Sequence, residues 1–334
     1  MNRRSLLLSL IGSVVPTSTF AQGRRPLRLL VHESVPRLDL LVDAISTSLP
    51  FGEIAVAAQE ARPAQIVARF SAQANVAELP DLAILPTPDL AVQLANEGRT
   101  FPQVLESGFD VPHWRSEVFV LGHDPAVFVT RKGSIAEQDL PRTRLDLARM
   151  LEQGGNRFQG RAGIVNVGTD SVAYAIASQD SLRSSMFWRI SAAFGASRAR
   201  IFDTADELLS ALSAGTIDFG YNIPITSARS FLRRDSEIEI IVPQDYVLGL
   251  PWCGLVPHGV TWPGPVPQAG GLVSLLTSQR VFDAFSEIGL ITPQKPSVIE
   301  NIQMIDPGPE LLVFLDPLKR SRFLDLWFGL VVQN

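Results

Sequence analysis

The chain has 334 residues, of which 46% are hydrophobic and 19% are charged, and its formal net charge is −5. This composition suits a folded chain of about two domains, and it excludes long disordered regions and an extended basic surface for nucleic acid. The single cysteine, Cys253, excludes an intramolecular disulfide framework and a cysteine-rich metal cluster.

The first 21 residues have the pattern of an export signal. Two arginines at positions 3 and 4 precede an apolar run over residues 5–15, and small residues stand at positions 19 and 21. The run is shorter than the roughly 20 residues that a membrane-spanning helix needs. We therefore predict a signal peptide over residues 1–21, a mature chain beginning near Gln22 and a periplasmic location. The alternative is a buried N-terminal helix.

Strand and helix patterns alternate along the rest of the chain. The first half of the chain is expected to form a strand at 27–31, helices at 38–49 and 64–75, a strand at 81–85, a helix at 88–96 and strands at 117–121 and 126–130. After these we expect a helix at 144–152, a strand at 162–167, helices at 171–178 and 205–214, and strands at 217–221 and 238–242. Thr143 is expected to cap one helix, Thr204 with Glu207 to form a capping box, and Asp316-Pro317 to open a last helix. This alternation predicts an α/β fold with two parallel sheets.

Small polar residues follow several of the predicted strands, at the edge where α/β proteins bind ligands. These junctions are His32-Glu33-Ser34, Pro86-Thr87, Gly168-Thr169-Asp170-Ser171 and Asn222. One such junction alone is ordinary helix capping, but their repetition indicates a site for a small polar or anionic solute. Residues 131–200 also carry eleven basic and six acidic side chains, which favours an anion; a solvated surface is the alternative.

The sequence gives little support for catalysis. It has no G-x-S-x-G, H-E-x-x-H or phosphate-binding loop motif, although Ser171, His123 and Asp170 supply the residue types of a hydrolase triad. We therefore predict a protein that is not an enzyme and that uses no cofactor and no metal. A periplasmic hydrolase is kept as the alternative, and it requires a nucleophile and a base within hydrogen-bonding distance.

Eight stretches of sequence, spread over nearly all of the chain after the signal, carry a resemblance. They are DLAILPTPDLAVQLANEG (81–98), WRSE (114–117) with DPAVFV (124–129), GIVNVGTDSVAY (163–174), FGYN (219–222), VPQDYVL (242–248), GPELLVFLD (308–316) and KRSRF (319–323). In this order they resemble periplasmic solute-binding proteins of ABC transporters of the ferric-iron type. The resemblance is greatest to the branch of the phosphoglycerate-transport regulatory protein.

The resemblance implies a two-lobed α/β protein of the type II venus-flytrap kind with two crossover strands, near residues 126–130 and Tyr246. Lobe one is expected at residues 24–124 plus 248–334 and lobe two at 125–247. The positions carried over as ligand contacts are Ser34, Thr87, Thr169, Ser171, Asn222 and Tyr246. The implied function is capture of a small-molecule ligand by a monomer that serves an ABC permease and binds no nucleic acid. The alternative is a ligand sensor for the periplasmic domain of a two-component histidine kinase.

One departure from this family concerns its metal chemistry. Ferric-iron members use two adjacent tyrosines, whereas Tyr221 is followed here by Asn222. The tandem phenolates are therefore missing, and we do not expect tight ferric-iron binding. The identity of the ligand does not follow from the resemblance.

Overall fold

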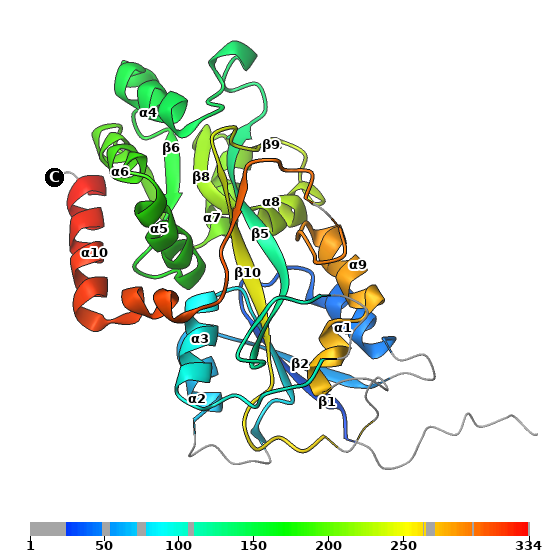
Figure 1. Ribbon diagram of the computed structural model, residues 1–334. Helices are drawn as coiled ribbons and strands as arrows, with labels where there is room; N and C mark the ends of the chain where they lie inside the picture. The colour runs from blue at the N-terminus through cyan, green and yellow to red at the C-terminus, as the bar shows by residue number, and fades with distance from the viewer. Residues whose placement is uncertain are drawn as a thin grey trace, which may run out of the picture.

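The computed structural model describes residues 25–48, 54–71, 78–105, 110–262, 264, 271–295 and 297–332, so the predicted signal peptide lies outside the described residues. Within these residues eleven strands form one mixed sheet, in the order β2-β1-β3-β10-β5-β8-β6-β7 with three strands attached to its sides. Figure 1 shows the elements in two groups, one above the other, with β5 and β10 running between them. The predicted α/β class with two crossover strands is confirmed. The expectation of two parallel sheets is wrong, because β10 runs antiparallel to β3 and β5 runs antiparallel to both β10 and β8, which joins the strands into one mixed sheet.

The strands of the lower group come from both ends of the chain. The parallel strands β1 (Leu27–His32), β2 (Val56–Ala61) and β3 (Leu82–Leu85) are joined by β10 (Val247–Leu255), which runs antiparallel to β3. In the upper group β6 (Ala162–Val165) is parallel to β7 (Arg200–Phe202) and to β8 (Phe219–Pro224). The attached strands are β4 (His113–Trp114), β9 (Ile238–Ile241) and β11 (Ile302–Met304).

Strand β5 (Val118–Arg131) is continuous, although the sequence predicted two strands separated at residues 122–125. It pairs with β10 as far as Pro125 and with β8 from Ala126 onward. Pro125 thus lies where the strand changes partners, a position at which the missing N–H of proline is tolerated. Because its first thirteen residues are buried, β5 continues through a segment whose local sequence resembles a turn.

Each group of strands has its own helices. The lower group packs α1 (Leu38–Ser46), α2 (Pro63–Arg69), α3 (Pro88–Asn96) and α9 (Gln279–Ile288). The upper group packs α4 (Arg144–Gln153), α5 (Ser171–Arg183), α6 (Met186–Ala196), α7 (Ala205–Ser213) and α8 (Ile225–Leu232). None of the helices in the described ranges is long and apolar enough to cross a membrane.

The predicted helix caps are largely present. Thr143 accepts a hydrogen bond from the backbone N–H of Asp146, and Thr204 accepts one from Glu207. The expected return bond at the second cap goes to a different residue, because the Glu207 carboxylate accepts from the N–H of Asp203. Both helices begin as predicted, since each cap is a contact between residues three apart.

The C-terminal helix α10 (Pro317–Val331) crosses to the upper group. It packs along α6, and Phe323 and Trp327 belong to the hydrophobic core of that group. The preceding turn is held by the Tyr174 hydroxyl, which donates to the backbone oxygen of Phe314 over 2.6 Å. The sequence placed this helix with lobe one, but its aromatic face contacts lobe two; the rest of the proposed division stays a prediction.

Cys253 allows a simple test of how tightly the hydrophobic core of the lower group is packed. Its side chain is fully buried, and burial raises the pKa of the thiol. The nucleophilic form is the thiolate, so we expect no reaction with an aromatic disulfide reagent in the native protein and one thiol per chain after denaturation. Rapid reaction of the native protein would contradict this packing.

Candidate functional site

A cavity lies between the two lobes and encloses about 390 Å³ of space, part of it open to solvent. Lobe one contributes Ser34, Pro86, Asp124 and Trp252 to its lining. The polar lining residues from lobe two are Asp170, Asn222, Thr226 and Ser227. No lysine or arginine is among the lining residues. The polar part of the wall therefore consists of hydroxyl and carboxyl groups from both lobes and the amide of Asn222, and the rest of the wall is apolar or aromatic.

The sheet topology explains why these residues meet. Strands β1, β3, β6 and β8 end on the cleft, and helices α3, α5 and α8 begin close to those ends. Such helix starts present free backbone N–H groups and the positive end of the helix dipole. The sequence predicted a site at strand ends, and these strand ends line the cavity.

A hydrogen bond crosses the cleft at the end of β1. The Nε2 atom of His32 lies 3.0 Å from the Ser171 hydroxyl at the start of α5. The Nδ1 atom of the same ring lies 2.8 Å from the Ser34 hydroxyl and accepts the backbone N–H of Ser34 over 3.2 Å. Burial lowers the pKa of His32 to about 4, so the ring is neutral near pH 7. Two of the predicted contact residues, Ser34 and Ser171, are thus brought together by a histidine.

Two carboxyl groups accept backbone N–H groups at helix starts on the cleft. Asp124 is almost fully buried in β5 and accepts the Thr226 hydroxyl over 2.5 Å and the Thr226 N–H over 3.2 Å, at the start of α8. Burial raises its pKa to about 6. Asp170 caps α5 by accepting the N–H of Ala173 over 2.8 Å, and burial, with a smaller effect of the Glu33 charge, raises its pKa. These carboxyls already satisfy N–H groups that an anionic solute would otherwise use.

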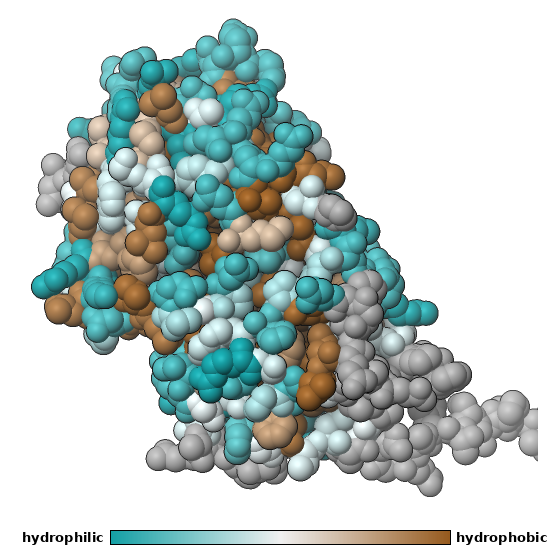
Figure 2. Space-filling model, in the orientation of Figure 1, coloured by the Kyte–Doolittle hydropathy of each residue, from teal (hydrophilic) through white to brown (hydrophobic). Residues whose placement is uncertain are grey.

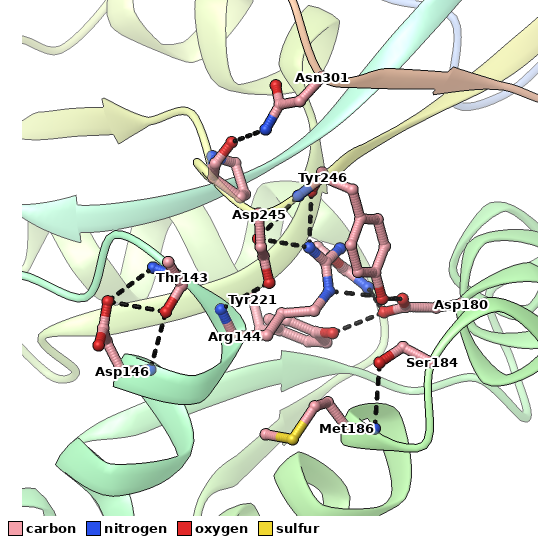
Figure 3. A network of polar contacts seen from close by, with 12 residues as sticks. Thr143, Arg144, Asp146, Asp180, Ser184, Met186, Tyr221, Asp245, Tyr246 and Asn301 are labelled. Carbon is pink, nitrogen blue, oxygen red and sulfur yellow. Dashed lines mark hydrogen bonds and ion pairs between the residues drawn. The ribbon is translucent and has the colours of Figure 1, made fainter.

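Two other predicted contacts, Asn222 and Tyr246, belong to a buried network in lobe two (Figure 3). The Asp180 carboxylate accepts the hydroxyls of Tyr221 and Tyr246, each over 2.5 Å, and the Asn222 amide over 2.8 Å. Asn222 also lines the cleft, in a left-handed backbone conformation with φ of 54°. The network therefore adjoins the cleft through Asn222.

A buried arginine completes this network. Arg144, at the first position of α4, lies 3.4 Å from Asp180 and 3.2 Å from Asp245, and it donates to the backbone oxygen of Tyr246 over 2.7 Å. Its guanidinium stacks 3.6 Å from the centre of the Tyr246 ring, a cation–π contact. The side chains of Arg144 and Asp180 are both fully buried. Burial, followed by the Asp180 charge, raises the pKa of both tyrosine hydroxyls, so neither is ready to act as a phenolate ligand.

The remaining two predicted contacts lie differently. Thr87 is fully buried at the start of α3, next to the lining residue Pro86, and its hydroxyl has no hydrogen-bond partner among the residues that the structure describes. Thr169 is exposed outside the lining, and its hydroxyl lies 3.1 Å from the Asp203 carboxylate. In the part of the chain that the structure describes, no three His, Cys, Asp or Glu side chains are grouped so as to hold a metal ion.

Sequence reasoning missed several residues of this region: Asp124, Asp180, Arg144, Thr226 and Trp252. It placed His32 in a junction at the end of a predicted strand but not among the ligand contacts. Arg144 and Asp180 had none, because a buried charged residue and a surface one look alike in a helical sequence pattern.

Comparisons with family models and with curated protein sequences find no match. Solved structures do match. A substrate-binding protein of an ABC transporter from Agrobacterium tumefaciens is 20% identical, with a TM-score of 0.77 over 93% of this chain and 96% of that one. Iron-bound HitA from Pseudomonas aeruginosa is 15% identical, with a TM-score of 0.63 over 92% and 99%. AfuA from Actinobacillus pleuropneumoniae, with fructose-6-phosphate bound, is 12% identical, with a TM-score of 0.63 over 94% and 100%. The chain therefore has the two-lobed fold of type II periplasmic binding proteins.

Proposed function

We propose that this chain captures a small polar solute between its lobes, in the periplasm, and delivers it to an ABC permease. The observation that carries the proposal is the cavity between the lobes, to which both lobes contribute polar side chains. A solute that touches both walls binds the closed arrangement better than an open one, and therefore shifts the protein toward closure. The permease can then distinguish the closed, loaded form. The alternative role, as a ligand sensor for a histidine kinase, would use the same cavity. Binding of the solute-loaded protein to the permease or to the periplasmic domain of the kinase distinguishes the two roles.

Observations on the cleft bear in both directions on the charge of the solute. The sequence predicts an anionic solute, and so does the resemblance to the phosphoglycerate-regulator branch. The hydroxyls and helix starts on the cleft support that prediction. The carboxyls of Asp124 and Asp170 at two of those helix starts oppose it. HitA holds iron and AfuA holds a sugar phosphate on this fold, so the lining side chains decide the ligand rather than the fold.

A thermal-shift screen tests the proposal with sugar phosphates, phosphoglycerates, carboxylates, amines and metal ions, followed by calorimetry on each compound that stabilises the protein. We expect at least one organic solute to raise the melting temperature. Ser34→Ala removes a lining hydroxyl and is expected to weaken binding about five-fold, the equivalent of one hydrogen bond of about 1 kcal/mol.

Thr169→Ala is the matched variant, because it also removes one hydroxyl but outside the lining. Unchanged affinity in this variant is expected. An equal loss in both variants would extend the contact set to Thr169, as the sequence predicted. If no solute in the screen stabilises the chain, solute capture is contradicted.

The hydrolase alternative has one observation in its favour, which is the 3.0 Å contact between Ser171 and His32. Two features oppose it. Nδ1 accepts a backbone N–H, so the ring proton is on Nε2, the atom that faces Ser171, and it cannot take the serine proton. The other partner of the ring is Ser34 rather than a carboxylate. Ester hydrolysis that disappears in Ser171→Ala would overturn the binding-only function.

A further inference from the structure

The cleft contains a bridge whose hydrogen-bonding pattern depends on the protonation state of one histidine. His32 stands at the end of β1 in lobe one and is 3% exposed. Its Nδ1 accepts the N–H of Ser34, so in the neutral ring the proton is on Nε2 and is donated across the cleft to the Ser171 hydroxyl. This bridge joins the first element of lobe one to the start of α5 in lobe two.

A second proton on the ring is costly because the ring is 3% exposed. It would bind to Nδ1, where the Ser34 hydroxyl oxygen at 2.8 Å can accept it while the Ser34 N–H loses its acceptor. A charged imidazolium would also lose most of its contact with water at this depth. This loss of water is relieved if the lobes separate, because water then reaches the ring, whereas the contacts with Ser34 lie within lobe one and do not depend on closure.

The charged groups around the ring do not provide a compensating partner. Glu33 follows His32 in the turn after β1, and its negative charge favours protonation, but its carboxylate pairs with Arg62, the N-cap residue of α2, over 3.1 Å. On the α5 side, the carboxyl of Asp170, next to Ser171, is used in capping the helix. Desolvation outweighs the Glu33 charge, and the pKa of His32 falls to about 4.

We propose that His32 is a proton-sensitive latch on the cleft: the neutral ring holds the two lobes together through Ser171, and protonation loosens them. The latch regulates the solute site and so rests on the proposed function for its biological role. The contact itself is present without any assumption about the solute. Acidification of the periplasm would then favour opening and solute release.

The direction and size of the effect follow from proton linkage. In an open cleft His32 regains an ordinary pKa of about 6.5, whereas closure lowers the pKa to about 4. The contribution of His32 to closure is complete above pH 6.5 and is lost as the pH falls toward 4. Between pH 7.5 and pH 5.0 the ratio of closed to open molecules is expected to fall about 30-fold from this group alone. Asp124 and Asp170 titrate with the opposite sign, since burial raises their pKa values, and a His32 variant separates the contributions.

The test measures the distance between the lobes in the chain without solute. Spin labels on Gln59→Cys in β2 and Ser210→Cys in α7, both exposed positions, report that distance by pulsed dipolar spectroscopy. Cys253 is buried and is not expected to be labelled. We expect a population at longer distance to grow between pH 7.5 and pH 5.0. In His32→Gln, which keeps a neutral donor at every pH, this growth should be absent.

His258→Gln is the matched control, because it removes an exposed histidine away from the cleft and should behave as the parent does. Ser171→Ala removes the partner of the latch; it should populate the longer distance at pH 7.5 and reduce the response to pH. Circular dichroism at both pH values verifies folding. An unchanged distance in the parent, or an equal pH response in His32→Gln, would overturn the latch. Failure of the solute screen with an intact pH response would instead count only against solute capture.

Discussion

Replacement of Asp180 by alanine is expected to lower the free energy of unfolding by about 3–5 kcal/mol. The carboxylate is fully buried and serves three donors, the hydroxyls of Tyr221 and Tyr246 and the amide of Asn222, beside the buried guanidinium of Arg144. Its removal leaves a buried cation whose one remaining charged partner, within the described ranges, is the partly exposed Asp245. Urea denaturation followed by circular dichroism measures the loss.

Asp206→Ala is the control for this experiment. Asp206 forms an ion pair with Arg234 over 3.6 Å in the same lobe, but both side chains are more than half exposed. Solvent screens such a pair, and its loss is expected to change the free energy of unfolding by less than about 1 kcal/mol. Equal effects of the two substitutions would show that the Asp180 network adds no more to stability than a surface ion pair does.

The network also connects stability to the cleft. Tyr246 immediately precedes the crossover strand β10, and Asn222 lines the cavity. The same carboxylate therefore fixes the entry to a crossover strand and one wall of the proposed site.

The surface of the upper group is hydrophilic around α4, while hydrophobic residues reach the surface along α10, where Leu318 and Leu326 are more than half exposed (Figure 2).

Asp124 is expected to make the protein less stable as the pH rises from 4 to 6. Its pKa is about 6 in the folded chain, against an ordinary value of 3.8, so the folded state binds the proton more tightly than the unfolded state does. The stabilising contribution of the proton is complete below pH 4 and is lost as the pH rises through 6. A difference of about two pKa units corresponds to about 3 kcal/mol.

Denaturation curves at pH 4 and pH 6.5 for the parent and Asp124→Asn measure this contribution. The variant keeps a side-chain oxygen for Thr226 but has no carboxyl to titrate, so its stability should rise relative to that of the parent as the pH increases. Asp43→Asn, which changes an exposed carboxyl on α1, should not alter the pH dependence in this way. If the parent and Asp124→Asn show the same pH dependence of stability, a group other than Asp124 causes it and the prediction is contradicted.

Local sequence signals correctly predicted the class of fold and several helix starts. Thr143, Thr204 and Asp316 each accept a backbone N–H from a residue two or three positions later, so the contact is encoded within one helical turn. Alternation of strand and helix patterns likewise predicted the α/β class. Helices α6, α8 and α9 were missed, and β5 was divided in two, because burial in the sheet outweighs the turn-like sequence at residues 122–125.

The arrangement of the site was decided by tertiary structure. His32 and Ser171 are 139 residues apart, and each looks like an ordinary polar residue at the end of a strand or the start of a helix. Arg144 and Asp180 stand on different helices, and their sequence pattern does not distinguish a buried pair from two solvated charges. The sequence by itself determined the α/β class and several helix starts, because those preferences are set within a few residues. It did not predict α6, α8, α9, β2 or β7, nor the continuity of β5. Which polar groups share a cleft, and which of them lose contact with water, depends on how the two crossover strands bring distant segments together.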